Sequence, residues 1–148
     1  MVNSSFFNSV KTKNLLLDSF SIRDGKNLFK MTCDFEIAKY VPGAYVKSLE
    51  QAYENIVFYR KYNGKGDFYI AIRIWTPTEK ATLAGLIIAT RPEKEIGIKS
   101  LEVAYLMGSN FRGKGYMQEA MESFIPLAKE MGYKQLIFEI IEDNEESI

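Results

Sequence analysis

The chain has 148 residues, of which 47% are hydrophobic and 14% aromatic, enough for one domain with a core. Its 19 basic and 19 acidic residues cancel, so the net charge gives no indication of a nucleic-acid or anionic-membrane partner. The sequence contains no histidine, which excludes Ser-His-Asp and Cys-His nucleophile systems and His-ligated zinc. Its single cysteine, Cys33, is interpreted as a core residue in a reducing compartment.

The N-terminus lacks the basic region and long apolar core of a signal peptide. No apolar run reaches the roughly 18 residues that suggest a membrane span. We therefore expect a single domain over residues 1–148, located in the cytoplasm and without a membrane partner. Residues 1–12 are polar and are expected to be loose.

The first half of the chain predicts one short strand and helical regions. Residues 14–17 have the length and composition of a strand. Residues 18–40 follow at roughly helical spacing, with an interruption at Asp24–Gly25. Ser48 with Gln51 has the pattern of a capping box, which predicts that a helix begins there. This helix is expected to bury Leu49, Tyr53, Ile56, Val57 and Tyr59.

Three apolar runs of strand length come next, at residues 67–75, 83–89 and 100–107. The loops that join them are short, which is typical of an antiparallel meander. In the first run the side chains alternate. The isoleucines share one face of the strand, and Tyr69 and Arg73 share the other.

A helix is predicted over residues 114–131, where Pro126 should produce a kink and Gly132 should end the helix. Its apolar stripe consists of Met117, Ala120, Met121, Phe124, Ala128 and Met131. Residues 135–141 are almost continuously apolar, as in a buried strand parallel to its predecessor. Strand, helix and strand from 100 to 141 then form a right-handed βαβ unit. The expected fold class is α/β, with a mixed sheet.

The connection between the meander and this helix has the composition of an anion site. Residues 108–115 combine three glycines with Arg112 and Lys114. Backbone N–H groups at a helix start have no intrahelical partner, and the helix dipole adds partial positive charge there. Because glycine also lets a phosphate approach the backbone closely, we expect a phosphorylated ligand at this turn.

The same turn resembles the acetyl-CoA signature of the GNAT acetyltransferases, Gln/Arg-x-x-Gly-x-Gly/Ala. Arg112 and Gly115 match the signature, whereas Met117 departs from its final Gly/Ala, as in some members of the ribosomal-protein acetylating branch. Glu119–Ala120 is similar to the Glu-Ala near the start of the helix in that branch. Asn144 and Ser147 are similar to the branch's Asn-x-x-Ser.

The resemblance covers residues 14–148 and implies a GNAT-like acyl-CoA N-acyltransferase fold with acetyl-CoA as acyl donor and no metal. In that family the strand before the signature offers backbone groups to the pantetheine arm, which implicates Tyr105, Leu106 and Met107. Asn144 is implied to reach the cofactor from beyond the last strand. The pyrophosphate is implied to lie on the N–H groups of Arg112, Gly113, Lys114, Gly115, Tyr116 and Met117.

The implied reaction is direct attack of a primary amine, on a protein N-terminus or a small molecule, on the thioester. It needs no histidine, but it needs a neutral amine, and a lysine-type amine has a pKa near about 10.4. Glu102 is the candidate base, with an outward-facing strand residue as the alternative interpretation. Glu36, Glu50 and Glu54 could attract a cationic acceptor or could simply lie on a solvated helix face. Ser147 could donate a proton to the sulfur or act as a helix cap.

Two other functions stay open. A GNAT-like domain could bind acyl-CoA without transferring the acyl group. Residues 108–114 also fit the first seven positions of a P-loop, Gly-x-x-x-x-Gly-Lys-[Ser/Thr], which would indicate a nucleotide-binding protein. The next residue, however, is Gly115, so the hydroxyl that holds Mg²⁺ in a P-loop is absent.

Members of the GNAT family usually continue past Asn-x-x-Ser into a further helix and two strands that form one wall of the acceptor site. This sequence ends at Ile148. We therefore expect the C-terminal portion of the family fold to be missing and the edge of the last strand to be exposed. An exposed edge favours pairing with another chain, so a homodimer is possible.

Overall fold

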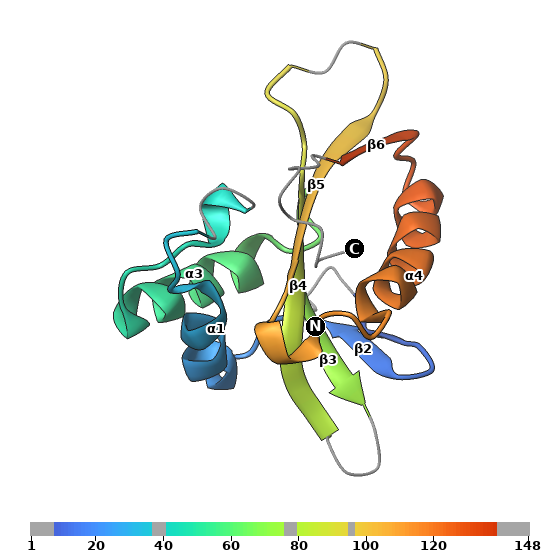
Figure 1. Cartoon of the computed structure of the whole chain (residues 1–148). Helices are drawn as coiled ribbons and strands as arrows, with labels where there is room; N and C mark the ends of the chain where they lie inside the picture. Colours follow the sequence, from blue (N-terminus) through green and yellow to red (C-terminus); the bar gives the residue numbers. More distant parts are fainter. Residues whose placement is uncertain (1–7, 37–40, 76–79, 95–96, 139–148) are drawn as a thin grey trace, which may run out of the picture.

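The computed structural model describes residues 8–36, 41–75, 80–94 and 97–138. Its strands form one sheet in the order β1-β2-β3-β4-β5-β6, with α1 and α3 on one face and α4 on the other (Figure 1). The elements are β1 (Val10–Lys11), β2 (Leu15–Asp18), η1 (Ile22–Asp24), α1 (Gly25–Thr32), η2 (Pro42–Ala44), α3 (Leu49–Tyr62), β3 (Phe68–Trp75), β4 (Lys80–Thr90), β5 (Ser100–Met107), η3 (Ser109–Phe111), α4 (Tyr116–Glu130) and β6 (Gln135–Phe138).

The predicted α/β fold with a mixed sheet is confirmed. Strands β3, β4 and β5 form the antiparallel meander, and β6 returns parallel to β5 after α4. The expectation that residues 1–12 are loose was wrong for Val10 and Lys11, which pair with Leu17 and Leu16 of β2. Val10 also packs against the core on the α4 side, and this packing explains why a short strand forms there.

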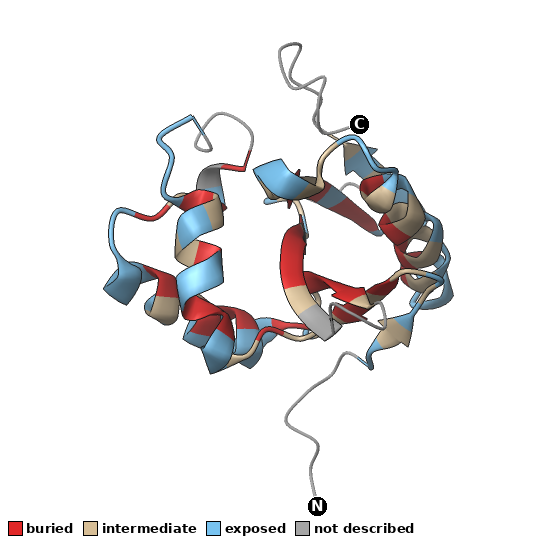
Figure 2. Cartoon of the chain, turned by 60° about the horizontal axis from the view of Figure 1, so that its bottom comes forward, coloured by how far each residue is buried: buried red, intermediate tan, exposed pale blue. Residues whose placement is uncertain are grey.

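Two apolar cores lie on opposite faces of the sheet, and the alternation within β3 separates them. Ile70, Ile72 and Ile74 point into the core beneath α4, whereas Tyr69 and Ala71 point into the core beneath α1 and α3. Figure 2 shows the buried central strands between the two helical layers. Because helices cover both faces, β3 is buried over nearly its whole length. Full burial of one such isoleucine is worth about 1.5–3 kcal/mol.

The predicted cap of α3 is confirmed. The Oγ of Ser48 accepts a hydrogen bond from the Gln51 backbone N–H at 3.1 Å. The Gln51 side chain completes the arrangement by accepting from the Lys47 N–H at 2.7 Å, one residue before the cap itself. Both bonds satisfy backbone N–H groups that have no partner within the helix. The residues around Ser48 therefore determine where α3 begins.

The predicted buried face of α3 was partly wrong. Leu49 and Val57 are 36% and 57% exposed. The helix buries Ile56 and Tyr59 as predicted and also Ala52, whereas Tyr53 is half-buried. The three buried residues recur at spacings of four and three and so share one side of the helix, whereas Val57 lies about 100° further round.

Helix α4 follows the prediction closely along its buried stripe. Met117, Ala120, Phe124 and Ala128 are buried, whereas Met131, just past the last turn, is 39% exposed. Met121, the remaining member of the stripe, is half-buried against the core. Pro126 lies inside the helix, and Gly132 follows its end with φ +98°. The kink at Pro126 stays a prediction.

Two burial predictions were wrong. Strand β6 is not a buried strand, because it is the edge of the described sheet and Ile137 is 43% exposed. Residues 139–141 of the predicted strand lie outside the described residues. Cys33 is exposed because it caps the end of α1, beyond the buried positions Leu28 and Thr32. None of the described helices is long and apolar enough to span a membrane.

A buried ion-pair network ties the start of α1 to the sheet. Arg73 of β3 donates to both carboxylate oxygens of Asp24, at 2.6 and 2.9 Å, and to Asp18 at 3.1 Å. Burial alone would lower the pKa of Arg73, but the hydrogen bonds and charges of Asp24 and Asp18 raise it. The interruption predicted at Asp24–Gly25 is the point where the 3-10 helix η1 ends and α1 begins.

Candidate active site

The turn between β5 and α4 has an open, glycine-dependent backbone. Gly113 and Gly115 have φ of +75° and +78°, the left-handed region that glycine adopts without strain. Gly115 is the N-cap of α4 and offers no side-chain cap, so the N–H groups of the first helical turn, which begins at Tyr116, lack that partner. A Cβ built at either glycine would meet nothing within 4 Å, so the surface above the turn is clear.

Arg112 fixes this turn against the end of β5. Its Nε donates to the Met107 carbonyl oxygen at 3.0 Å, and the side chain is half-buried. Lys114 is exposed. Part of the Arg112 side chain is thus used to hold the backbone, a contact that sequence reasoning did not predict.

Glu119 fixes the start of α4 from the other direction. Its carboxylate accepts hydrogen bonds from the Asn14 backbone N–H at 2.7 Å, the Asn14 side-chain amide at 2.9 Å and the Thr12 hydroxyl. Burial alone would raise the pKa of Glu119, but these hydrogen bonds and the charge of Lys13 lower it. The glutamate singled out by the resemblance therefore attaches α4 to the β1–β2 segment.

The side chains of the predicted pantetheine strand point alternately to the two cores. Tyr105 and Met107 pack on the α4 side, and Leu106 is buried on the α1–α3 side. Met117, at the helix start, is also buried. Tyr105 is only half-buried, and the assignment of the backbone groups of Tyr105, Leu106 and Met107 to a ligand stays a prediction. Asn144 and Ser147 lie outside the described residues.

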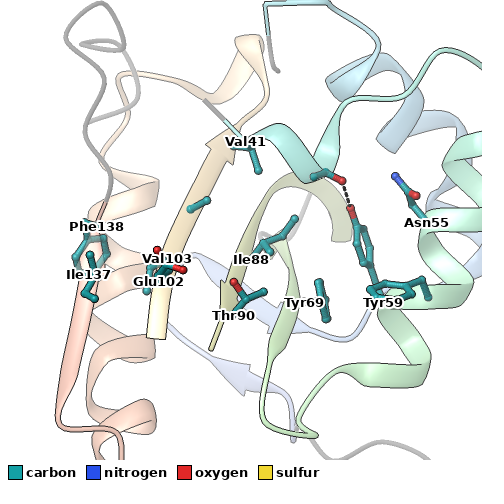
Figure 3. A pocket seen from close by; sticks show the side chains of 13 residues that line it. Val41, Asn55, Tyr59, Tyr69, Ile88, Thr90, Glu102, Val103, Ile137 and Phe138 are labelled. Carbon is teal, nitrogen blue, oxygen red and sulfur yellow. Dashed lines mark hydrogen bonds between the residues drawn. The ribbon is translucent and has the colours of Figure 1, made fainter. Parts of the chain in front are cut away.

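A pocket of about 640 Å³ lies on the opposite face of the sheet from α4. The strand register explains its floor. Glu102 of β5 lies opposite Thr90 of β4 and Ile137 of β6. In the next row, Ile88 of β4 lies beside Tyr69 of β3, and the row continues to Ala104 of β5. Figure 3 shows Glu102 and Ile137 on one side of the pocket, Ile88 and Thr90 in the middle, and Tyr59 and Asn55 on the far side.

Aromatic side chains form the far wall of this pocket. The rings of Tyr59 and Tyr69 stack at 5.0 Å, and Phe58 meets Tyr69 edge to face at 5.5 Å. The Tyr59 hydroxyl donates to the Gly43 carbonyl oxygen at 3.5 Å. Burial raises the pKa of Tyr59 and, with the charge of Asp67, that of Tyr69. Both phenols are therefore neutral at physiological pH.

Comparison with known proteins identifies the family of this chain. The profile of the acetyltransferase (GNAT) domain matches residues 14–148. The chain belongs to the GNAT acetyltransferase family. An uncharacterized N-acetyltransferase, YnaD of Bacillus subtilis (strain 168), is 26% identical over 132 residues, which are 86% of this chain and 66% of that protein. The chain thus spans just under two thirds of that relative.

Solved GNAT structures share the fold. A putative ribosomal-protein-serine acetyltransferase from Vibrio cholerae superposes with a TM-score of 0.73 at 17% identity, covering 97% of this chain and 79% of that one. The microcin C7 self-immunity acetyltransferase MccE, solved with acetyl-CoA and AMP, gives a TM-score of 0.68 at 19% identity over 92% of this chain and 74% of that one. At such identities the likeness concerns the fold alone.

Within this GNAT fold, one candidate carboxylate lies at the pocket and three do not. All four are exposed, but only Glu102 lines the pocket among them, whereas Glu36, Glu50 and Glu54 do not. The solvated-helix interpretation fits Glu50 and Glu54 on α3, whereas Glu36 lies in a turn beyond the end of α1. No group of three or more Cys, Asp or Glu among the described residues could hold a metal ion. The P-loop alternative gains no support from any of these findings.

Sequence reasoning missed most of the pocket. Phe58, Asn55, Ile88 and Thr90 were not proposed as site residues, although all line it. The one signal in the sequence was the alternation of β3, which separates Tyr69 from the isoleucines and places it on the opposite face of the strand. The contact between the lining residues of α3 and those of the strands depends on the sheet register and on where α3 packs. A local sequence pattern contains neither.

Proposed function

We propose that the protein is an acetyl-CoA-dependent N-acetyltransferase that acts on a primary amine by direct attack. The observation that carries this proposal is the position of β5. The glycine turn follows the C-terminal end of the strand, and the pocket with Glu102 opens on its other half. A thioester held along β5 would therefore face an acceptor in the pocket.

The turn supplies the donor side. The backbone N–H groups from Arg112 to Met117, with the positive end of α4, suit a pyrophosphate. Gly113 and Gly115 leave the approach clear. We assign the backbone of Tyr105, Leu106 and Met107 to the pantetheine arm, as the family resemblance implies, and Asn144 to a cofactor contact.

Glu102 supplies the base on the acceptor side. The ammonium form of the acceptor loses one proton, through Glu102 or a water that it holds, to give the neutral amine. The amine nitrogen then forms a bond to the thioester carbon, and the carbon–sulfur bond breaks. The second proton leaves the nitrogen and the thiolate takes up a proton, so the products are an amide, a thiol and one released proton.

Calorimetric titration with acetyl-CoA, CoA and ATP tests the donor assignment. Acetyl-CoA and CoA should bind and ATP should bind more weakly. Binding of ATP alone, or of none of the three, would contradict the proposal. Release of free thiol with a panel of amines then separates an enzyme from a protein that binds acyl-CoA without transfer.

A further inference from the structure

We propose that the acceptor is a small molecule that carries its primary amine on an aryl-alkyl body, with the ring held in the aromatic half of the pocket. This inference rests on the proposed function and names the class of substrate for that site. The pocket has one carboxylate end and one aromatic end, and their separation sets the shape of the acceptor.

The strand register gives that separation. Glu102 lies on β5, and Tyr69 lies two strands away on β3, with Ile88 of β4 between the two strands. Neighbouring strands are about 4.8 Å apart, and Glu102 lies two residues along β5 from Ala104, which shares the row of Tyr69, so the backbones of Glu102 and Tyr69 are roughly 12 Å apart. An ammonium group near Glu102 and a ring near Phe58 are therefore spanned by an aromatic ring with a short alkyl chain.

The aromatic end is accessible to a ligand. Phe58 is 48% exposed although it lines the pocket and touches Tyr69. A planar ring inserted beside it can make edge-to-face or offset contacts. The floor between the two ends is apolar at Ile88 and Ala104. This surface favours an apolar linker over a polar one.

The charges and hydrogen-bonding groups favour the same class. No lysine or arginine is among the described residues that line the pocket, and Glu102 is the one carboxylate there. A cationic acceptor without a carboxylate of its own is therefore complementary. A peptide N-terminus would bring several backbone groups that need partners, but the neutral polar side chains of the lining are few: Asn55, Thr90, Tyr69 and Tyr59, whose hydroxyl already donates to Gly43. A volume of about 640 Å³ also suits a small molecule.

The test measures thiol release from acetyl-CoA with 2-phenylethylamine, ethylamine and a short peptide with a free N-terminus. The first two differ by a phenyl ring, and their kcat/KM values are compared per neutral amine because the ring makes 2-phenylethylamine the weaker base. We expect kcat/KM to be about 10- to 100-fold higher for 2-phenylethylamine than for ethylamine, from burial of the ring. Equal efficiency of the two amines, or a preference for the peptide, overturns the inference and leaves the proposed function standing. Transfer to none of the three, with acetyl-CoA bound, counts against both.

A matched pair of variants locates the ring. Phe58→Ala should lower kcat/KM for 2-phenylethylamine about fivefold and leave that for ethylamine unchanged. Val57→Ala removes the neighbouring exposed side chain, which does not line the pocket, and should alter neither amine. An equal loss for both amines in Phe58→Ala would mean that Phe58 does not contact the ring. Because Phe58 is half exposed, the variant is expected to fold, and acetyl-CoA affinity checks this.

Discussion

The turn after β5 and the pocket beside β5 are built in different ways. The turn consists of consecutive residues, 108–115, and its shape depends on glycines with positive φ and on the N–H groups of one helix start. The pocket is assembled from segments spread between Val41 and Phe138, and its character depends on side chains such as Phe58 and Glu102.

This difference determines what kind of change each region tolerates. A backbone site keeps its function when a side chain is exchanged, provided that the φ angles persist. A side-chain site keeps its backbone but loses its function when one group is removed. Of the experiments below, those on Glu102 and Gly115 each alter one of these regions, and those on Arg73 and Glu119 alter contacts that hold the helices in place.

The largest effect is expected on stability, from Arg73→Ala. The substitution leaves Asp24, which is 5% exposed, without its buried cation, and α1 loses its tie to β3. We expect the free energy of unfolding to fall by about 3–5 kcal/mol in urea denaturation. Arg91→Ala, which removes an exposed pair with Asp67, should cost about 0–1 kcal/mol. Similar losses in the two variants would show that the Arg73 network does not hold the α1 side together.

The next largest effect is expected on catalysis, from Glu102→Gln. The amide cannot take a proton, so kcat should fall about 100-fold while acetyl-CoA affinity stays unchanged. Glu54→Gln, on an exposed face of α3 outside the pocket, should change neither quantity. Thiol-release kinetics and calorimetry measure the two. An unchanged kcat in Glu102→Gln would return this residue to an outward-facing strand position and leave the base unassigned.

Gly115→Ala tests the backbone character of the turn. Alanine at φ +78° costs about 1–2 kcal/mol of stability, and relief of that strain should displace the N–H groups and weaken acetyl-CoA binding. Gly97→Ala is the matched control, because Gly97 has φ +76° and open space around it but lies in another loop. It should cost similar stability and leave the affinity unchanged. Equal affinities in the two variants would mean that the turn does not hold the ligand.

The smallest effect is expected from Glu119→Gln and should depend on pH. The folded-state pKa of Glu119 is lowered from its ordinary value of 4.5, so its stabilising contribution is present above that value. It is lost as the pH falls through the lower folded-state pKa. At neutral pH the variant should be about 1 kcal/mol less stable from the lost hydrogen bonds, and the difference should shrink as the pH falls below 4.5. The exposed Glu122→Gln on the same helix is the control. A difference that does not vary with pH would contradict the charge-based role.

The sequence by itself determined the features that depend on neighbouring residues. The alternation in β3, the cap at Ser48, the stripe of α4 and the glycine turn were predicted because each depends on contacts within a few residues. The signature residues of the turn, together with the order of these elements, carried the resemblance to the GNAT family, which the match over residues 14–148 confirms.

Only the tertiary structure decided which faces are covered and which side chains meet. Cys33 and Val57 were predicted to be buried and are exposed, because burial depends on where α1 and α3 dock. The aromatic wall forms because the register places Tyr69 two strands from Glu102 and α3 brings Phe58 over it. Such contacts join residues tens of positions apart. Their geometry follows from sheet pairing and helix packing together, which no local pattern contains.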